Sequence, residues 1–199
     1  MVVGIKWVSF ESTICRTVTE EGDKRRFATI VEPHLGEALT LARWLTGSRT
    51  DAQDVVQEAC LRAFRAISSY GGGSSRSWVL TIVRNTAYTW LGKARQTRFV
   101  AMDDLKEDER LQMESGGIAE SETASTPETE LIAQADADRL TKAIDALPTE
   151  FREALVLRDL QGLDYREIAS VTAVPLGTVM SRLARARRRL IHTLRTTEQ

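Results

Sequence analysis

The segment PLGTVMSRLARARRRL, residues 175–190, combines two patterns on what its spacing predicts to be a single helix. When a helical wheel is advanced by 100° per residue, four apolar residues fall within about 40° of one another. These residues are Val179, Leu183, Ala186 and Leu190. Four polar residues gather about 60° to 120° to one side: Thr178, Arg182, Arg185 and Arg189. The pattern predicts a helix with one buried apolar stripe and one ordered basic face.

The preceding sequence supplies partners for that apolar stripe. YREIASVTA, residues 165–173, predicts a short amphipathic helix, and Pro175 then suits the first turn of the next one. LPTEFREALVLRDLQGLD, residues 147–164, predicts a further helix between Pro148 and Gly162. This succession of helices with a tight turn before the basic one is typical of a helix-turn-helix DNA-binding domain. The alternative is a solvated arginine-rich surface helix, which is what most charge runs are.

Composition extends this interpretation to the whole chain of 199 residues, of which 42% are hydrophobic but only 6% aromatic. Apolar residues recur at helical spacing and few segments alternate as strands do, so we expect an all-α fold. Residues 101–130 hold ten acidic and two basic side chains, for a net charge of −8, and are poor in large apolar residues. Because such a stretch cannot bury enough surface to fold, it predicts a flexible acidic linker between two small helical domains.

The cysteines and histidines exclude several classes of protein. Cys15 and Cys60 match no metal-ligand or redox spacing, which predicts two free thiols in a reducing cytoplasm. His34 and His192 have no evident nucleophile or metal ligand beside them, so we expect no catalytic residues, no bound metal and no cofactor. The first residues are too interrupted for a signal peptide, and no run of 18 apolar residues occurs. We therefore expect a cytoplasmic protein that does not insert into a membrane and is not an enzyme.

In the N-terminal half, DAQDVVQEACLRAFRAI, residues 51–67, predicts an amphipathic helix with an unusual polar face. The side opposite its apolar stripe carries Asp54, Gln57, Glu58 and Leu61. An exposed leucine within an acidic rim suggests a protein-docking surface, although a single exposed leucine is also common by chance.

The next predicted helix, residues 77–98, mixes aromatic and cationic side chains. Aromatic rings can stack on unpaired bases while cations follow the phosphates, a combination suited to single-stranded nucleic acid. Trp78 and Ile82 are more typical of core residues than of base contacts. The glycines at 71–73 permit a flexible loop but are not followed by the lysine of a phosphate-binding motif.

Taken together, four segments resemble the conserved parts of extracytoplasmic-function (ECF) sigma factors, a group within the bacterial sigma-70 family. They are DAQDVVQEACLRAF, WVLTIVRNTA, LPTEFREALVLRDLQGLDYREIA and PLGTVMSRLARARRRL. The resemblance runs in order from about Phe27 to Leu194, apart from the acidic linker. It implies four parts: an N-terminal extension (1–23), a sigma region 2-like domain (24–98), the linker (99–130) and a sigma region 4-like helix-turn-helix domain (131–199).

The resemblance also implies a role for each set of residues. Asp54, Gln57, Glu58 and Leu61 match the segment that docks on the β′ clamp helices of core RNA polymerase. The segment that melts and reads the −10 promoter element corresponds to Tyr70, Arg76, Arg84, Asn85 and Tyr88. The reader of the −35 element in the major groove corresponds to Thr178, Ser181, Arg182, Arg185 and Arg189. The linker is expected to run through the polymerase toward the RNA exit path.

Three positions depart from the family pattern: the loop before Trp78 has Arg76 near the place of a second aromatic, Thr89 replaces a common aspartate, and Met180 replaces a common basic residue. They concern the preferred promoter bases rather than the class. We expect a dissociable sigma subunit that binds core polymerase, including its β subunit, and promoter DNA, and that is held by an anti-sigma factor in a stress response. The alternative is a stand-alone helix-turn-helix repressor or activator with an effector-binding N-terminal domain.

Overall fold

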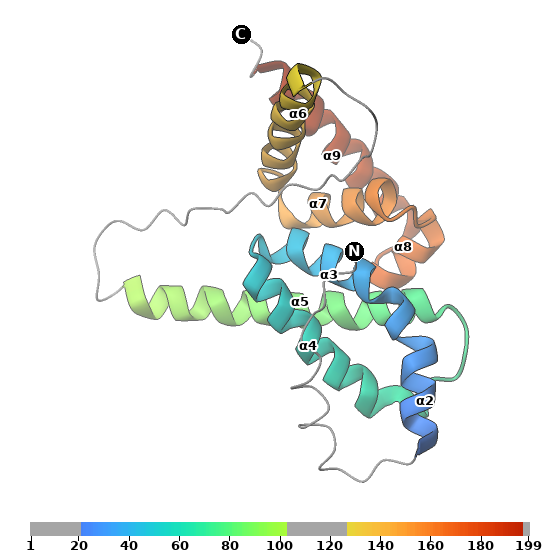
Figure 1. Cartoon of the computed structure of the whole chain (residues 1–199). Helices are drawn as coiled ribbons and strands as arrows, with labels where there is room; N and C mark the ends of the chain where they lie inside the picture. Colours follow the sequence, from blue (N-terminus) through green and yellow to red (C-terminus); the bar gives the residue numbers. More distant parts are fainter. Residues whose placement is uncertain (1–20, 103–126, 197–199) are drawn as a thin grey trace.

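The computed structural model describes residues 21–102 and 127–196, with side chains described over 21–94 and 135–196. Every regular element in those two ranges is helical, as Figure 1 shows. The first group comprises α2 (Glu21–Ile30), η1 (Glu32–His34), α3 (Leu35–Thr46), α4 (Arg49–Ala66), η2 (Ile67–Ser69) and α5 (Ser75–Met102). The second comprises α6 (Pro127–Asp145), α7 (Thr149–Leu155), η3 (Val156–Leu160), α8 (Tyr165–Thr172) and α9 (Leu176–Thr196). The predicted all-α, two-domain fold is confirmed.

Helices α5 and α6 reach into the predicted linker from its two sides. Helix α5 continues through residues 99–102, which are apolar and precede the acidic run, and α6 begins at Pro127, a residue favoured in a first helical turn. Helix α2 likewise includes residues 21–23 of the expected N-terminal extension. The remainder of that extension and the central 103–126 of the linker lie outside the described residues.

In the N-terminal domain, α3, α4 and α5 pack against one another around a core of small and aliphatic side chains. Ala52, Ala59 and Ala63 are buried along α4 and let the helices approach closely, while Leu41 and Leu80 are fully buried. The turn between α3 and α4 is defined at both ends. Gly47 ends α3 with a φ of 74°, and the Ser48 side chain accepts a hydrogen bond from the Asp51 amide to begin α4.

The C-terminal domain is the predicted helix-turn-helix. Helix α8 begins with a capping box, in which Asp164 and Glu167 each accept a hydrogen bond from the other's backbone N–H. Ala173 then adopts a left-handed conformation with a φ of 54°, and α9 begins immediately after Pro175. Val179, Leu183 and Ala186 are buried, as the apolar stripe predicts, and Leu190 is partly buried.

The two domains lie against each other and share one continuous hydrophobic core. Helix α7 packs on α3, and α8 packs on the first half of α5, while α6 runs beside α9 at the far end of the molecule (Figure 1). Within the described residues, no helix is both long enough and apolar enough to cross a membrane.

The capping box makes a specific prediction for stability. Replacing Asp164 by alanine removes the acceptor for two backbone N–H groups and should lower the free energy of unfolding by about 1 kcal/mol. Asp164→Ser keeps a side-chain acceptor and should retain most of that stability. Urea denaturation followed by circular dichroism measures both variants, and equal loss in the two would show that the cap does not act through its acceptor oxygen.

Candidate nucleic-acid interface

The basic face of α9 lies open over much of its length. Arg185 and Arg189 are exposed, and the Arg189 guanidinium lies 5.1 Å from the centre of the Phe151 ring. Ser181 is exposed and its hydroxyl donates to the Thr178 carbonyl at 2.9 Å. Because the neighbouring apolar stripe of α9 is buried in the core, the helix cannot rotate about its axis, and its basic face keeps a fixed orientation.

Arg182, in contrast, is only 19% exposed, because its Nη2 pairs with Glu150 Oε2 on α7 at 3.0 Å. The pair lies within the C-terminal domain and restrains the side chain. Arg182 would therefore have to exchange this carboxylate for a nucleic-acid group before it could contact a base or a phosphate.

The candidate docking face of α4 is accessible. Asp54 and Gln57 are exposed, and Glu58 is half-buried and accepts a 2.8 Å hydrogen bond from Arg62 Nε. Leu61 is partly buried, so the expectation of an exposed leucine is wrong for this residue. Helical side chains lean back over the preceding turn, where the stems of neighbouring polar residues shield part of their surface.

The candidate single-strand face around α5 is occupied by the chain itself at three of its five predicted residues. Arg84 Nε donates to Glu153 Oε1 of α7 at 2.7 Å, and the Tyr88 hydroxyl donates to Glu153 Oε2 at 3.3 Å. The Arg84 guanidinium also lies 4.5 Å from the centre of the Tyr88 ring. Asn85 remains exposed, with its Oδ1 accepting a hydrogen bond from Arg84.

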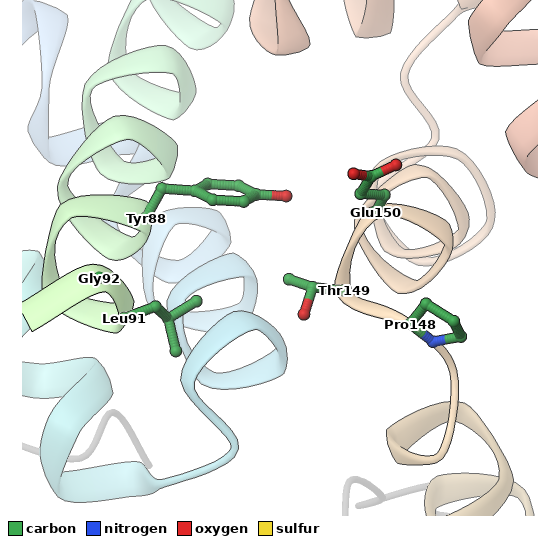
Figure 2. Close-up of a pocket in the computed structure, with 6 residues that line it drawn as sticks. All are labelled: Tyr88, Leu91, Gly92, Pro148, Thr149 and Glu150. Atoms are coloured by element: carbon green, nitrogen blue, oxygen red, sulfur yellow. The ribbon is translucent and has the colours of Figure 1, made fainter. Parts of the chain in front are cut away.

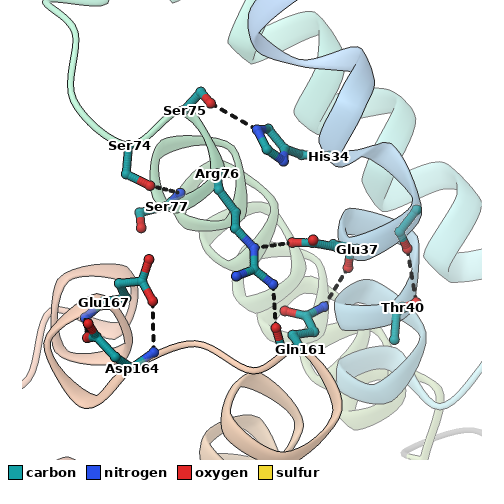
Figure 3. Close-up of polar contacts among 11 residues, drawn as sticks. His34, Glu37, Thr40, Ser74, Ser75, Arg76, Ser77, Gln161, Asp164 and Glu167 are labelled. Carbon is teal, nitrogen blue, oxygen red and sulfur yellow. Dashed lines mark hydrogen bonds and ion pairs between the residues drawn. The ribbon is translucent and has the colours of Figure 1, made fainter.

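Arg76 is the third residue held across the domain boundary, as Figure 3 shows. It donates through Nε to Glu37 of α3 at 2.5 Å and through Nη2 to the carbonyl oxygen of Gln161. The Gln161 amide in turn donates to the Glu37 carbonyl at 2.7 Å. Gln161 reaches this position because the π-helical turn η3 widens the end of α7. In this turn the backbone N–H of Gln161 donates to the Val156 carbonyl, five residues earlier.

Tyr70 lies outside this network. Its ring centre is 5.0 Å from that of Trp78, and its hydroxyl donates to the Gly73 carbonyl at 2.7 Å. Tyr70 thus orders the glycine loop before α5, while Trp78 supports it from the core side as expected.

The electrostatics of the domain boundary centre on Glu153, whose side chain has no exposed surface. Burial raises the pKa of its carboxyl, and the attraction of Arg84 opposes that rise only in part. Burial and the neighbouring Glu153 carboxylate also raise the pKa of Tyr88 to about 12, so this phenol remains a hydrogen-bond donor. The ionised carboxylate is therefore held at a site where its partners do not fully replace water.

Three buried polar atoms at the same boundary have no hydrogen-bond partner among the described residues: Trp44 Nε1, Arg152 Nε and Gln161 Oε1. Arg152 nevertheless joins the domains, because its Nη1 donates to the Trp44 carbonyl at 2.9 Å. A buried polar atom left unpaired costs about 1–3 kcal/mol. The contact between the domains is therefore less well satisfied than the core of either one.

A cleft of about 440 Å³ lies beside this boundary (Figure 2). Tyr88, Leu91 and Gly92 of α5 line one side, and the residues from Pro148 to Glu150 at the start of α7 line the other. The two domains are thus in contact at Glu153 but separated next to it.

Comparison with known proteins identifies the two halves. The family model for sigma-70 region 2 matches residues 30–97, and the model for sigma-70 region 4 matches residues 137–190. The ECF RNA polymerase sigma-E factor of Escherichia coli is 35% identical over 169 residues, covering 84% of this chain and 86% of that protein. The chain belongs to the ECF sigma factors of the sigma-70 family. It is thus an alternative sigma factor, and a stand-alone helix-turn-helix regulator is not favoured.

Further proteins are similar to the chain in sequence or in fold. SigE of Mycolicibacterium smegmatis is 35% identical over 164 residues, covering 81% of this chain and 58% of that protein. The sigma factor RpoE of Bartonella quintana, solved with the anti-sigma factor NepR, has a TM-score of 0.65 at 24% identity and covers 88% of this chain and 98% of its own. CnrH, solved with the cytosolic domain of CnrY, has a TM-score of 0.56 at 24% identity, with coverages of 87% and 90%. The two solved structures share the fold of this ECF sigma factor.

The contacts that join the two sigma domains, above all those of Glu153, were not predicted from the sequence. One signal was present, because Val156 and Leu157 lie three and four residues after Glu153 and therefore share its helix face. Both are fully buried. A glutamate on an apolar helix face requires a buried partner, but the sequence does not show that the partner is on α5.

The raised pKa of Glu153 predicts a pH dependence with a definite sign. A carboxyl with a raised pKa binds its proton more tightly in the folded state, so its contribution to stability is present at low pH and is lost as the pH rises through the folded-state pKa. The unfolding free energy of the wild type should therefore fall relative to that of Glu153→Gln, which cannot titrate, between acidic and neutral pH. Urea denaturation of both proteins across this pH range measures the difference between their unfolding free energies. A difference that does not change with pH would contradict the prediction.

Proposed function

We propose that this ECF sigma factor binds core RNA polymerase as a dissociable specificity subunit and directs it to a small set of promoters. In this role it carries out no covalent chemistry and works in the cytoplasm. The observation that carries the proposal is the pairing of an accessible acidic face on α4 with a basic face on α9 that the core holds in one orientation. One surface suits a protein partner and the other suits duplex DNA.

Each candidate surface has a separate task. The α4 face, with Asp54, Gln57, Glu58 and Leu61, docks on the β′ clamp helices, and the chain also contacts the β subunit. Exposed α9 side chains enter the major groove of the −35 element, where an arginine can donate two hydrogen bonds to a guanine. The −10 strand is captured at α5 and its preceding loop, where binding an unstacked base offsets a few kcal/mol of base-pair opening.

An inhibitory partner is part of this proposal. RpoE of B. quintana and CnrH were both solved in complex with a partner, NepR and the cytosolic domain of CnrY respectively. We infer that this chain is similarly held by an anti-sigma factor until a stress signal releases it.

In vitro transcription provides the direct test. Core polymerase plus this chain should initiate at discrete positions on a library of genomic fragments, whereas core polymerase alone should not. Asp54→Arg reverses one exposed charge on α4 and should reduce both capture of the chain by immobilised core enzyme and transcript yield. The proposal fails if no start site depends on the chain.

The basic face of α9 yields a second, residue-specific prediction. If Arg185 donates two hydrogen bonds to a guanine, Arg185→Ala should weaken −35 recognition by about 1–3 kcal/mol and relax the preference at one base pair. Arg188→Ala is the matched control, because it removes the same charge from an exposed position outside the predicted face. The change in base preference is measured by letting promoters that differ at single −35 positions compete for the holoenzyme. Equal effects of the two variants would show that Arg185 makes only a general phosphate contact.

A further inference from the structure

The ion pair between Arg84 and Glu153 places a carboxylate where a nucleic-acid phosphate would be expected to bind. Glu153 engages Arg84 and Tyr88 together, which are one cation and one hydroxyl donor of the candidate −10 surface. A carboxylate and a phosphate accept the same kind of charge-assisted hydrogen bond from a guanidinium. The contact with Glu153 and contact with a DNA strand therefore compete for the same donors.

Arg84 and Glu153 differ in what each would lose if the pair were broken. The Glu153 side chain is fully buried, whereas Arg84 retains 17% exposure at the surface of its own domain. Removing one partner of a buried ion pair is strongly destabilising, because it leaves the other charge uncompensated. Loss of Arg84 would leave the Glu153 carboxylate with the weaker 3.3 Å hydrogen bond from Tyr88 and the more distant charge of Arg182.

Elsewhere at the domain boundary, several buried polar atoms lack a partner among the described residues. These atoms belong to Trp44, Arg152 and Gln161, which are residues that join the domains. The cleft beside Tyr88 also leaves α5 and the start of α7 without close packing. These unpaired groups weaken the contact between the domains, which the shared hydrophobic core favours.

We propose that Glu153 is an internal competitor for the −10 strand: it masks Arg84 and Tyr88 in the free chain, and transfer of Arg84 to another anion releases the C-terminal domain. Capture of the strand and separation of the two domains are then one coupled event. The masking part rests on the proposed function, whereas the dependence of domain contact on the Arg84–Glu153 pair does not.

The test measures domain separation in the full chain by fluorescence energy transfer. Dyes are attached at Thr50→Cys and Ser170→Cys, two exposed positions in different domains and outside every proposed contact, in a Cys15→Ser background. Cys60 stays unlabelled because it is buried and its pKa is raised to about 11. Energy transfer is recorded over a urea series below the unfolding transition, and circular dichroism verifies that each variant is folded.

Arg84→Met should lower the ratio of closed to open chains by roughly tenfold or more, because it strands the buried carboxylate. Arg84→Met/Glu153→Gln should restore energy transfer toward the wild-type level, since no buried charge then lacks a partner. Arg62→Met is the matched control, because it removes one arginine from a pair that lies within α4. An Arg84→Met chain that stays as closed as the wild type, or a double variant as open as the single one, would overturn the proposal.

Titration with a labelled single-stranded 20-nucleotide DNA of random sequence tests the masking. Fluorescence anisotropy reports the binding of the DNA. Binding should lower energy transfer in the wild type, and the decrease in energy transfer should be at least tenfold smaller in the double variant. Binding without a change in transfer would overturn the coupling. Absence of any binding would contradict the proposed −10 role and the masking with it, while the Arg84→Met result would still decide the dependence on the ion pair.

Discussion

The burial of the Glu153 carboxylate constrains how the two domains meet. An ionised group without access to water needs a counter-charge and hydrogen-bond donors, and α7 supplies neither for this side chain. Arg84 and Tyr88 of α5 supply both from the other domain. Glu153 of the helix-turn-helix domain therefore obtains its hydrogen-bond donors from the neighbouring domain.

The two candidate DNA surfaces differ in availability. Arg185 and Arg189 lie to one side of the buried stripe of α9 and remain exposed. Arg76, Arg84 and Tyr88 lie on the side of the N-terminal domain that faces α7 and η3, where protein acceptors bind them. An ECF sigma factor in this arrangement presents its −35 candidates to solvent and keeps most of its −10 candidates within its own structure.

Hydrophobic packing and unpaired polar atoms have opposite effects on the contact between the two domains. The hydrophobic core is continuous from the N-terminal to the C-terminal domain, which favours contact between them. The unpaired polar atoms of Trp44, Arg152 and Gln161 oppose it. An interface with both features is less stable than the core of either domain, which suits subunits that must change their relative position when they bind a large partner.

The amino-acid sequence by itself determined what depends on near neighbours along the chain. Helical spacing predicted that Val179, Leu183 and Ala186 would be buried, and Pro175 marked the start of α9, because both signals act within one or two turns. Motif order was sufficient to identify the family, since it needs no three-dimensional information. The roles assigned to individual site residues remain predictions.

Only the tertiary structure decided which side chains meet across a long sequence separation. Arg84 and Glu153 are 69 residues apart, and no local pattern relates them. The pairing of Arg182 with Glu150 likewise depends on a neighbour that the spacing of one helix does not specify. Periodicity determines which face of a helix is apolar, but the partner of a buried charge is determined by how the helices pack, because electrostatic compensation acts through space rather than along the chain.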